Sequence, residues 1–320
     1  MSIHTPKRVL AVCFSQTGQL QDIADQILAP LASAPEVSIH IERLKPRQKY
    51  PFPWTFLRFF DTFPETAHLD PIELEPLQIN SNDDFDLVII FYQVWFLAPS
   101  LPITSFLKHP TVAQVLKDKP VITVIACRNM WMMAQEKTKL LLNNIGARLI
   151  DNVVFTDKSN VFATLITTPR WLLTGKKEGF WGLPRAGVSE HDTAHSRRFG
   201  HAILDGLRTH AERSASPLLS GLQAVQADPR LIISERAGTR SFFLWGKLLK
   251  RFGKAGAFAR RPWVVAYVVF LFSLIITVVP ISLTLQFLLR PLLRQRLARQ
   301  KIYFEQPSGS GDERMTQYDF

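Results

Sequence analysis

The chain alternates between short apolar runs and amphipathic stretches, and this alternation predicts its elements. Nearly continuous apolar runs, the pattern of strands buried on both faces of a sheet, cover residues 9–14, 86–92, 121–126 and 149–155. Residues 37–44 alternate apolar and polar positions and predict one further strand. Helices are predicted over residues 22–31, 102–116, 131–145 and 191–213. Gly146 follows the third of these helices in the position of a C-terminal cap.

Five strands that alternate with helices predict an α/β fold with a parallel, doubly wound sheet and right-handed crossovers. The first crossover is short, which favours the strand order 2-1-3-4-5 and a ligand site beside the first strand, where the order reverses. Ligands of such sheets lie outside the carboxyl ends of the strands. We therefore expect the segments after the first, third and fourth strands, residues 15–20, 93–99 and 127–133, to converge on one site.

Two insertions interrupt this pattern, and both are rich in aromatic residues. Residues 50–64 are dense in Phe and Trp where a connecting helix would normally lie. Residues 160–190 form a connection longer than most loops of compact domains, and their aromatic content argues against disorder. We assign residues 1–213, insertions included, to one domain, followed by a basic, amphipathic linker over residues 214–261.

The segment that follows the linker, residues 263–289, carries no charged residue over 27 positions, more than the roughly 20 that an apolar helix needs to cross a bilayer. It predicts a membrane segment over residues 262–290, formed by one tilted helix or by a re-entrant or interfacial helical hairpin that divides at Pro280. Both flanks are basic, which favours the cytoplasmic side for both. In the tail, residues 291–320, the basic part precedes a polar part from Gln306 that we expect to be disordered.

Composition adds the class of partner. The formal net charge is +11 and the pI is about 9.8, but the basic residues are concentrated on the two flanks of the apolar segment. This distribution favours anionic lipid and argues against nucleic acid. The N-terminus has no apolar signal-like region, and two cysteines in the body fit a reducing compartment. We expect the protein at the cytoplasmic face of the inner (plasma) membrane.

The first converging segment joins a buried strand to a helix and is the candidate phosphate site. It consists of Ser15, Gln16, Thr17, Gly18, Gln19 and Leu20. Backbone N–H groups, two hydroxyls and the positive end of the helix suit an anion. The Lys-Ser/Thr pair of a Walker loop is absent, and one glycine stands where a dinucleotide fingerprint needs three. A single phosphate is therefore expected and FMN is the candidate cofactor; an ordinary turn capped by Ser15 or Thr17 is the alternative.

The second and third segments each carry a tryptophan. A flavin needs flat apolar walls and a few hydrogen-bond donors around its ring, and both segments supply these. The ring contacts that we expect are Gln93, Val94, Trp95, Phe96, Cys127, Arg128, Asn129 and Trp131. Ordinary core packing is the alternative for the two tryptophans, and a solvated position at a helix start is the alternative for Arg128. The sequence predicts no metal site.

Several short motifs together resemble one family. The run Ser15–Gly18 resembles the flavodoxin phosphate loop, Ser/Thr-x-Thr-Gly-x-Thr, from which Leu20 departs at the last hydroxyl position. From about Val9 through the apolar segment, the chain resembles the dialkylresorcinol condensing enzyme family of DarA type, in the flavodoxin-like superfamily. The motifs that carry this resemblance are Ser15–Leu20, Pro51–Trp54, Tyr92–Trp95, Arg128–Trp131, Ala134–Lys137 and Thr174–Lys177.

The resemblance implies a flavodoxin-like fold and an FMN-dependent aromatase step in dialkylresorcinol or aryl polyene lipid biosynthesis. The substrate would be a dialkylated cyclohexane-1,3-dione, closed by a ketosynthase-like partner. Oxidation to the resorcinol removes two hydrogens, because a base takes the acidic proton beside a carbonyl and the flavin takes hydride. Tyr92, Arg128 and Asn129 are candidates for holding the ring oxygens, and His191 or His195 for the base. We expect the insertions to form an apolar channel for the alkyl chains, and quinone is a candidate electron acceptor.

Two other functions remain open from the sequence. One is a flavodoxin-type NAD(P)H:quinone reductase or electron carrier at the membrane, and the other is a flavin-free scaffold that anchors a polyketide-type partner. A plain carrier of this type is expected to be acidic, whereas the chain is basic. Bound FMN distinguishes the two redox functions from the scaffold.

Overall fold

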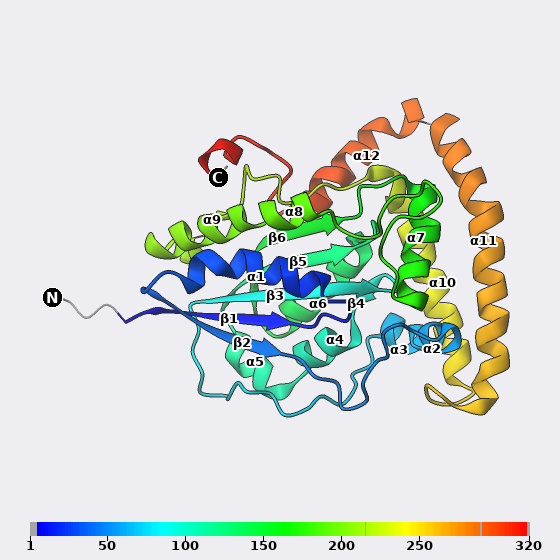
Figure 1. Ribbon diagram of the computed structural model, residues 1–320, viewed down its shortest axis with the longest axis horizontal. Coiled ribbons are helices and arrows are strands. Elements are labelled where there is room, and N and C mark those ends of the chain that lie inside the picture. Colours follow the sequence, from blue (N-terminus) through cyan, green and yellow to red (C-terminus); the bar gives the residue numbers. More distant parts are fainter. Residues whose placement is uncertain (1–4, 215, 289, 319–320) are drawn as a thin grey trace.

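The computed structural model of the chain describes residues 5–214, 216–288 and 290–318, and the side chains of residues 278–293 lie outside this description. Its centre is a mainly parallel sheet of order β2-β1-β3-β5-β6, with β4 antiparallel to β3 beside this path (Figure 1). The strands are β1 Lys7–Cys13, β2 Val37–Arg43, β3 Leu87–Trp95, β4 Ala98–Pro99, β5 Pro120–Cys127 and β6 Arg148–Thr156.

The sheet has one strand more than expected, and the strand numbers in its order therefore change. We expected five strands in the order 2-1-3-4-5, and the sheet has six. The additional strand, β4, forms because the chain turns back after Trp95 and pairs it with Ala98. A hairpin thus replaces the open loop expected over residues 93–99. The order reverses beside β1, so the carboxyl ends of β1 and β3 border the position where doubly wound sheets bind ligands.

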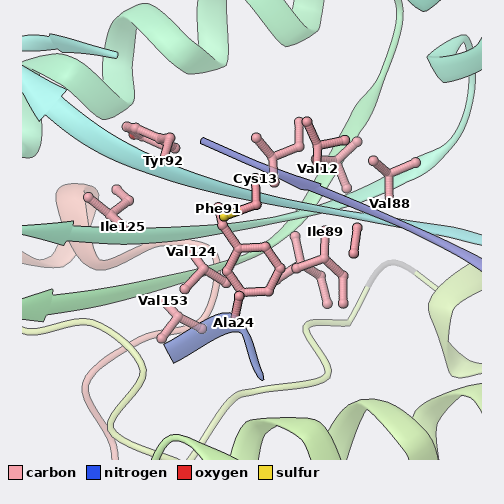
Figure 2. Packing of buried hydrophobic residues seen from close by; sticks show 14 of the residues in the cluster. Val12, Cys13, Ala24, Val88, Ile89, Phe91, Tyr92, Val124, Ile125 and Val153 are labelled. Carbon is pink, nitrogen blue, oxygen red and sulfur yellow. The ribbon is translucent and has the colours of Figure 1, made fainter. Parts of the chain in front are cut away.

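Helices cover both faces of the sheet, because strands with apolar residues on both faces need a partner on each. One face is covered by α1 Gln19–Ala32, α8 Glu190–His195 and α9 Arg197–Arg208 (Figure 1). The other is covered by α4 Leu101–Leu107, α5 Pro110–Leu116 and α6 Met132–Asn144 (Figure 1). Phe91 and Val124 are fully buried on the face covered by α1, where Ala24 packs beside them, whereas Val12 and Tyr92 are buried on the opposite face (Figure 2).

Two predicted helices are each divided in the structure. The helix expected over residues 102–116 is split into α4 and α5, because Pro110 disfavours helical backbone in the residue before it and His109 becomes the N-terminal cap of α5. The helix expected over residues 191–213 is split into α8 and α9 at Ser196. Short 3-10 helices follow at Ala211–Arg213, Pro229–Leu231, Phe258–Arg260 and Met315–Gln317.

The insertions and the predicted linker contain further helices. The first insertion forms α2 Phe56–Asp61 and α3 Phe63–His68, and the second forms α7 Val161–Thr174. The region predicted as a linker contains the 19-residue helix α10 Ile232–Lys250, which packs against α3. Figure 1 shows α3, α7 and α10 at the end of the molecule toward which the parallel strands point. They therefore cover the edge of the sheet where the candidate site lies.

The apolar segment forms α11, Arg261–Leu288, one continuous helix that runs past Pro280 and follows the outside of the molecule (Figure 1). The division at Pro280 expected for a hairpin is therefore absent from this helix. α12, Arg290–Glu305, leads back to the sheet domain. Among the described residues, one helix is long and apolar enough to cross a membrane, with its most apolar part at Phe258–Thr277.

The polar tail was expected to be disordered, and the structure corrects this for residues 306–318. Ser308 is buried, and its hydroxyl donates a hydrogen bond of 2.7 Å to Oδ1 of Asp151 on β6. The N–H of Val225 donates to the carbonyl of Gly309 at 3.1 Å. The composition of this Gly/Ser-rich segment predicted disorder because composition does not show which distant residues a segment contacts. In the structure, the segment is ordered by its hydrogen bond to the buried carboxylate of Asp151 on β6.

Candidate functional site

The segment between β1 and α1 has the features of an anion site. Gly18 takes a φ of 85°, a left-handed conformation that suits glycine. It occupies the N-cap position of α1, so no side chain there satisfies the first N–H groups of the helix. Within the described part of the chain, the N–H groups of residues 15–18 donate no hydrogen bond. The Oγ of Ser15 is buried and likewise has no partner among the described residues. Unpaired donors at a helix N-terminus are the groups that bind a phosphate.

Other side chains of this segment hold the insertions in place. Nε2 of Gln16 donates to the carbonyl of Pro51 at 2.9 Å, and Nε2 of Gln19 donates to the carbonyl of Val188 at 3.2 Å. Leu20 is fully buried in the sheet core. Leu20 belongs to the expected cofactor-binding segment, and its buried side chain limits it to a backbone contribution there. The departure of Leu20 from the flavodoxin pattern therefore serves packing.

The second converging segment is a tight hairpin. Phe96 and Leu97 have φ values of 47° and 58°, although neither is a glycine, and their backbone resembles the type I′ turn of two-residue hairpins. Gln93 accepts a hydrogen bond from the N–H of Ser100 at 3.0 Å, and Val94 pairs with Pro99. Left-handed backbone at non-glycine residues costs on the order of 1–2 kcal/mol each, so the surrounding packing must enforce it.

Packing around this hairpin is almost entirely aromatic. The Trp95 ring lies edge-on to those of Phe14, Tyr50 and Trp54, with centroids 5.8, 5.0 and 5.7 Å away. Phe96 packs on the other side among rings of α2, α3 and α10, including Phe242. The hairpin thus joins the sheet edge to the aromatic insertion.

The third converging segment contributes a cation, Arg128, that is not held in a close ion pair. Arg128 is half-buried, and its Nε donates to Oδ1 of Asn129 at 3.2 Å. Among the described residues, no carboxylate lies within ion-pair distance of its guanidinium. Burial lowers the pKa of Arg128. A desolvated, unpaired guanidinium suits an anionic oxygen of a ligand.

The remaining predicted residues of this segment are packed inside. Trp131 is 1% exposed and precedes α6 directly. Burial raises the pKa of the Cys127 thiol, so this cysteine is neutral. Neither residue offers a reactive group.

Tyr92 does not reach the site through its hydroxyl. It is fully buried on the face of the sheet covered by α6, where the hydroxyl donates to Oε1 of Gln135 at 2.6 Å (Figure 2). Gln135 donates in turn to Thr123 at 2.9 Å. Burial raises the pKa of Tyr92. We therefore assign Tyr92 to the core network and not to the holding of substrate ring oxygens, the role for which the sequence made it a candidate.

His191 is also separated from the three converging segments. It is exposed on α8, with its Nδ1 at 3.2 Å from Nδ1 of His195. Both line a cavity at the carboxyl end of β6, together with Lys158 and Phe199, and no residue of the three converging segments lines this cavity. The structure therefore does not bring His191 or His195 together with Arg128 and Asn129. Among the described residues, no group of His, Cys, Asp and Glu is arranged to hold a metal ion.

Two donors that the sequence did not single out lie on the insertions. The indole Nε1 of Trp54 and the Oγ1 of Thr167 are buried and have no hydrogen-bond partner among the described residues. Trp54 is tied to α7 by its N–H, which donates to the carbonyl of Leu172 at 2.9 Å. α7 turns small residues inward, namely Ala163, Thr164 and Thr167, where a core helix would carry large apolar ones. This small, hydroxyl-bearing face suits a polar ligand.

Glu235 of α10 is a further group that sequence analysis missed. It is fully buried, its Oε2 accepts a hydrogen bond of 2.8 Å from the N–H of Met133, and its Oε1 has no partner among the described residues. Burial raises the pKa of Glu235 to about 7. A carboxylate from a distant helix thus caps the start of α6, directly after the third converging segment.

These groups fit FMN by their chemistry. Ser15 and the free N–H groups before α1 are donors for a phosphate monoester. Trp54 and Thr167 supply neutral donors from the insertions, and Arg128 supplies a cation at the carboxyl end of β5. The orphaned Oγ of Ser15 is the observation that decides this fit, because a buried hydroxyl without a partner costs about 1–3 kcal/mol.

Comparisons with known proteins give partial likenesses to flavoproteins. The structure of an archaeal flavodoxin is 10% identical in sequence to this chain. The match covers 63% of this chain and 99% of the flavodoxin, with a TM-score of 0.35. An FMN-bound flavoprotein of Lactobacillus acidophilus is 15% identical, and the match covers 47% of this chain and 93% of that protein at a TM-score of 0.37. Megasphaera elsdenii flavodoxin is 18% identical, and the match covers 46% of this chain and 84% of the flavodoxin at a TM-score of 0.28. No protein-family model matches the chain, and no curated protein matches it. At these scores, the site assignment depends on strand topology and loop geometry.

Proposed function

We propose that the protein is a membrane-associated, FMN-dependent oxidoreductase that oxidises a dialkylated cyclohexane-1,3-dione to a dialkylresorcinol. The observation that carries the cofactor is the set of unpaired donors at the β1–α1 junction, above all the buried Oγ of Ser15. The observation that supports a ring substrate with oxygen substituents is the unpaired guanidinium of Arg128 at the end of β5. The substrate class comes from the family resemblance.

In this function the cofactor supplies the acceptor for a hydride equivalent. The residues of the chain bind the substrate ring and orient it. Arg128 and Asn129 hold a ring oxygen as it gains negative charge, and the proton beside the carbonyl of a 1,3-dione is acidic enough for a modest base. Glu235 fixes the start of α6, and with it the position of residues 128–131. We treat Glu235 as a positioning residue.

The aromatic insertion suits a lipophilic substrate. The rings of Phe59, Phe60, Phe63 and Phe96 form one continuous set of contacts that leads from the β3 hairpin toward α11. We propose that alkyl chains pack along this set, that a ketosynthase-like enzyme supplies the dione, and that quinone in the cytoplasmic leaflet of the inner membrane reoxidises the cofactor.

The test uses the full chain purified in mild detergent. We expect it to bind FMN and to convert a synthetic dialkylcyclohexane-1,3-dione to the resorcinol, two hydrogens lighter, as seen by mass spectrometry. Bound FMN with NAD(P)H:quinone activity and no resorcinol would support the reductase alternative instead. Failure to bind FMN at all would refute both redox functions and favour the scaffold.

A further inference from the structure

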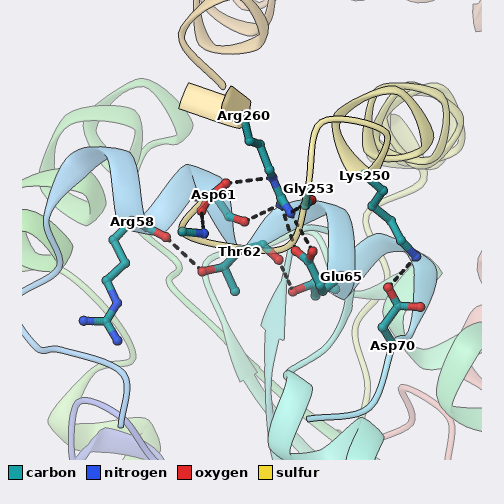
Figure 3. Close-up of polar contacts among 10 residues, drawn as sticks. Arg58, Asp61, Thr62, Glu65, Asp70, Lys250, Gly253 and Arg260 are labelled. Atoms are coloured by element: carbon teal, nitrogen blue, oxygen red, sulfur yellow. Dashed lines mark hydrogen bonds and ion pairs between the residues drawn. The ribbon is translucent and has the colours of Figure 1, made fainter. Parts of the chain in front are cut away.

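Both ends of the apolar helix α11 are joined to the same domain. At its start, Arg260 is fully buried and donates to both carboxylate oxygens of Glu65 at 2.6 and 2.8 Å (Figure 3). It also donates to the carbonyl of Asp61 at 2.6 Å and forms an ion pair with the Asp61 carboxylate at 2.8 Å. These contacts fix the residue directly before α11 to the helices α2 and α3.

The far side of α11 returns to the domain through α12. Phe304 is buried in the core of the sheet domain, and the carboxylate of Glu305 accepts a hydrogen bond of 3.1 Å from the N–H of Ala227. The hydroxyl of Tyr303 donates to Glu136 on α6 at 2.7 Å. The chain after α11 is thus as firmly docked as the chain before it.

This arrangement is incompatible with a helix that crosses a bilayer. If α11 crossed the hydrocarbon core of about 30 Å, the 16 residues of α12 would have to cross it again to reach the sheet. A helix of 16 residues is only about 24 Å long. The described part of α12 also exposes Arg294, Arg296 and Arg299, which would be placed in hydrocarbon.

The two faces of α11 have different environments. Val264, Tyr267 and Val268 are buried against α2, α3 and α10. Val269 and Ile276, on another face, are 62% and 71% exposed, and 22% of the most apolar stretch is buried. An ordinary interfacial helix is apolar on one side only, whereas α11 is apolar on the side toward its own protein and also on the side away from it. The outer side requires an apolar environment of its own.

A second helix shows the same outward pattern. α7 turns its small residues inward and leaves Phe162 and Ile166 70% and 54% exposed. α7 and α11 both lie at the end of the molecule toward which the strands point (Figure 1). Two helices from different parts of the sequence thus expose large apolar side chains at the end that holds the candidate site.

Charge identifies what covers these side chains. The chain has no acidic residue between Glu235 and Glu305, and Lys247, Arg251 and Lys254 are exposed just before α11. An anionic lipid surface complements this distribution, because basic residues near such a surface are attracted while apolar side chains enter the acyl region. A second copy of the chain would bring the same positive charges against each other.

We propose that the protein is mounted on one leaflet of an anionic membrane, with α11 lying in the plane of the interface and the sheet domain and residues 294–318 on the same side. The candidate site then faces the leaflet. This inference rests on the membrane association proposed above but is independent of the aromatase chemistry.

The depth of α11 tests this arrangement. Single cysteines at Val265→Cys, Val269→Cys, Phe272→Cys and Ile276→Cys share one helix face, carry nitroxide labels, and span about 16 Å along the helix axis. The protein is bound to vesicles of phosphatidylcholine and phosphatidylglycerol, and accessibility to oxygen and to a water-soluble nickel chelate gives the depth of each label. The unsubstituted chain reports background labelling of Cys13 and Cys127.

We expect all four labels to lie at similar depth within the interface, and binding to fall at least about tenfold in vesicles without the anionic lipid. A steady change of depth approaching 16 Å from residue 265 to residue 276 would show that α11 crosses, and would overturn this inference while leaving membrane association intact. Labels that stay in water, or that contact one another between two copies without lipid, would overturn the inference and the proposed membrane association together.

A same-side test is independent of depth. Asn144→Cys lies on exposed α6 and Thr316→Cys lies on the exposed tail, on either side of α11 in sequence. In sealed vesicles of cell membrane, a membrane-impermeant maleimide is expected to label both from the cytoplasmic face and neither from the other. Labelling of the two positions from opposite faces would refute the arrangement.

Discussion

Ser15 carries an unmet hydrogen-bonding need. Its Oγ is buried at the end of β1 with no partner among the described residues, which is unfavourable in the protein by itself and becomes favourable when an acceptor arrives. The Ser15→Ala variant should therefore bind FMN about tenfold more weakly, while its stability without FMN stays equal or rises. Fluorescence titration of FMN and thermal melting of the cofactor-free protein measure the two effects. Lower stability of the cofactor-free variant would show that Ser15 has a partner within the chain.

Thr167 makes a sharper test because α7 supplies its own control. Thr167 and Thr164 are both buried on the inner face of α7, but the hydroxyl of Thr164 already donates to the carbonyl of Val161 at 2.8 Å. Thr167→Val should weaken FMN binding by one to two orders of magnitude, the size of a hydrogen bond to a charged group. Thr164→Val should leave it within about twofold. Equal effects of the two substitutions would indicate loss of helix packing and would refute a role of Thr167 in cofactor binding.

Residues of this site differ in how far sequence reveals them. Ser15 to Gly18 were predicted because strand, glycine and helix follow each other locally. Trp54 and Thr167 were missed because a buried donor without a partner becomes visible only once the two insertions have folded, which no periodicity in the sequence reports. Tyr92 was misplaced because side chains on a strand alternate between faces, and its side turned out to be the one covered by α6.

At the scale of elements, Arg260 decides whether α11 stays docked. It is a fully buried cation held by Asp61 and Glu65, and burial raises the pKa of Asp61. Arg260→Met leaves the Glu65 carboxylate without its cation and the Asp61 carboxylate with only the N–H of Gly256. Removing one partner of a buried ion pair typically costs about 3–5 kcal/mol. We expect this loss to appear locally, as faster hydrogen exchange in α2, α3 and the first turns of α11, with the sheet unchanged.

The control for this prediction is Arg230→Met. The side chain of Arg230 is 73% exposed and its ion pair with Asp228 lies at the surface, where such pairs contribute at most about 1 kcal/mol. Hydrogen exchange of α11 should remain as in the unsubstituted chain. If Arg260→Met and Arg230→Met have the same effect, the buried ion pair does not hold α11.

Elements were predicted well where their own sequence is periodic and poorly where a partner defines them. Four of the five long strands follow from apolar runs of suitable length, and β2 follows from the alternation of apolar and polar residues. The strand β4 was missed because Phe96 and Leu97 are unusual in left-handed backbone, and Leu97 packs against Gly238 of α10, a contact between distant parts of the chain. The region of α10 was predicted as a linker because the inner face of this helix packs against α3 and α6, and the sequence does not show these distant contacts.

At the scale of the whole molecule, buried carboxylates tie distant segments together and make stability depend on pH. Asp151 on β6 accepts hydrogen bonds from the N–H groups of Leu218 and Leu219 at 2.7 and 3.1 Å and from Ser308 at 2.7 Å. Burial nevertheless raises its pKa from 3.8 to about 6. Burial likewise raises the pKa of Glu235 from 4.5 to about 7. Both groups therefore bind their proton more tightly in the folded chain than in the unfolded one.

The direction of the pH dependence follows from this difference. The stabilisation that protonation gives is complete below the unfolded pKa values of 3.8 and 4.5 and is lost as pH rises through about 6 for Asp151 and about 7 for Glu235. Each group should contribute on the order of 3 kcal/mol between these limits.

In mild detergent, we expect Asp151→Asn to flatten the fall of the melting temperature between pH 4 and 6, and Glu235→Gln to flatten it between pH 5 and 7. Because the two carboxylates do not share a partner, the double variant should lose both steps additively. A melting temperature of the unsubstituted chain that rises steadily from pH 4 to 7, and is not altered in slope by either substitution, would show that these carboxylates are ionised without cost and that other groups set the stability of the molecule.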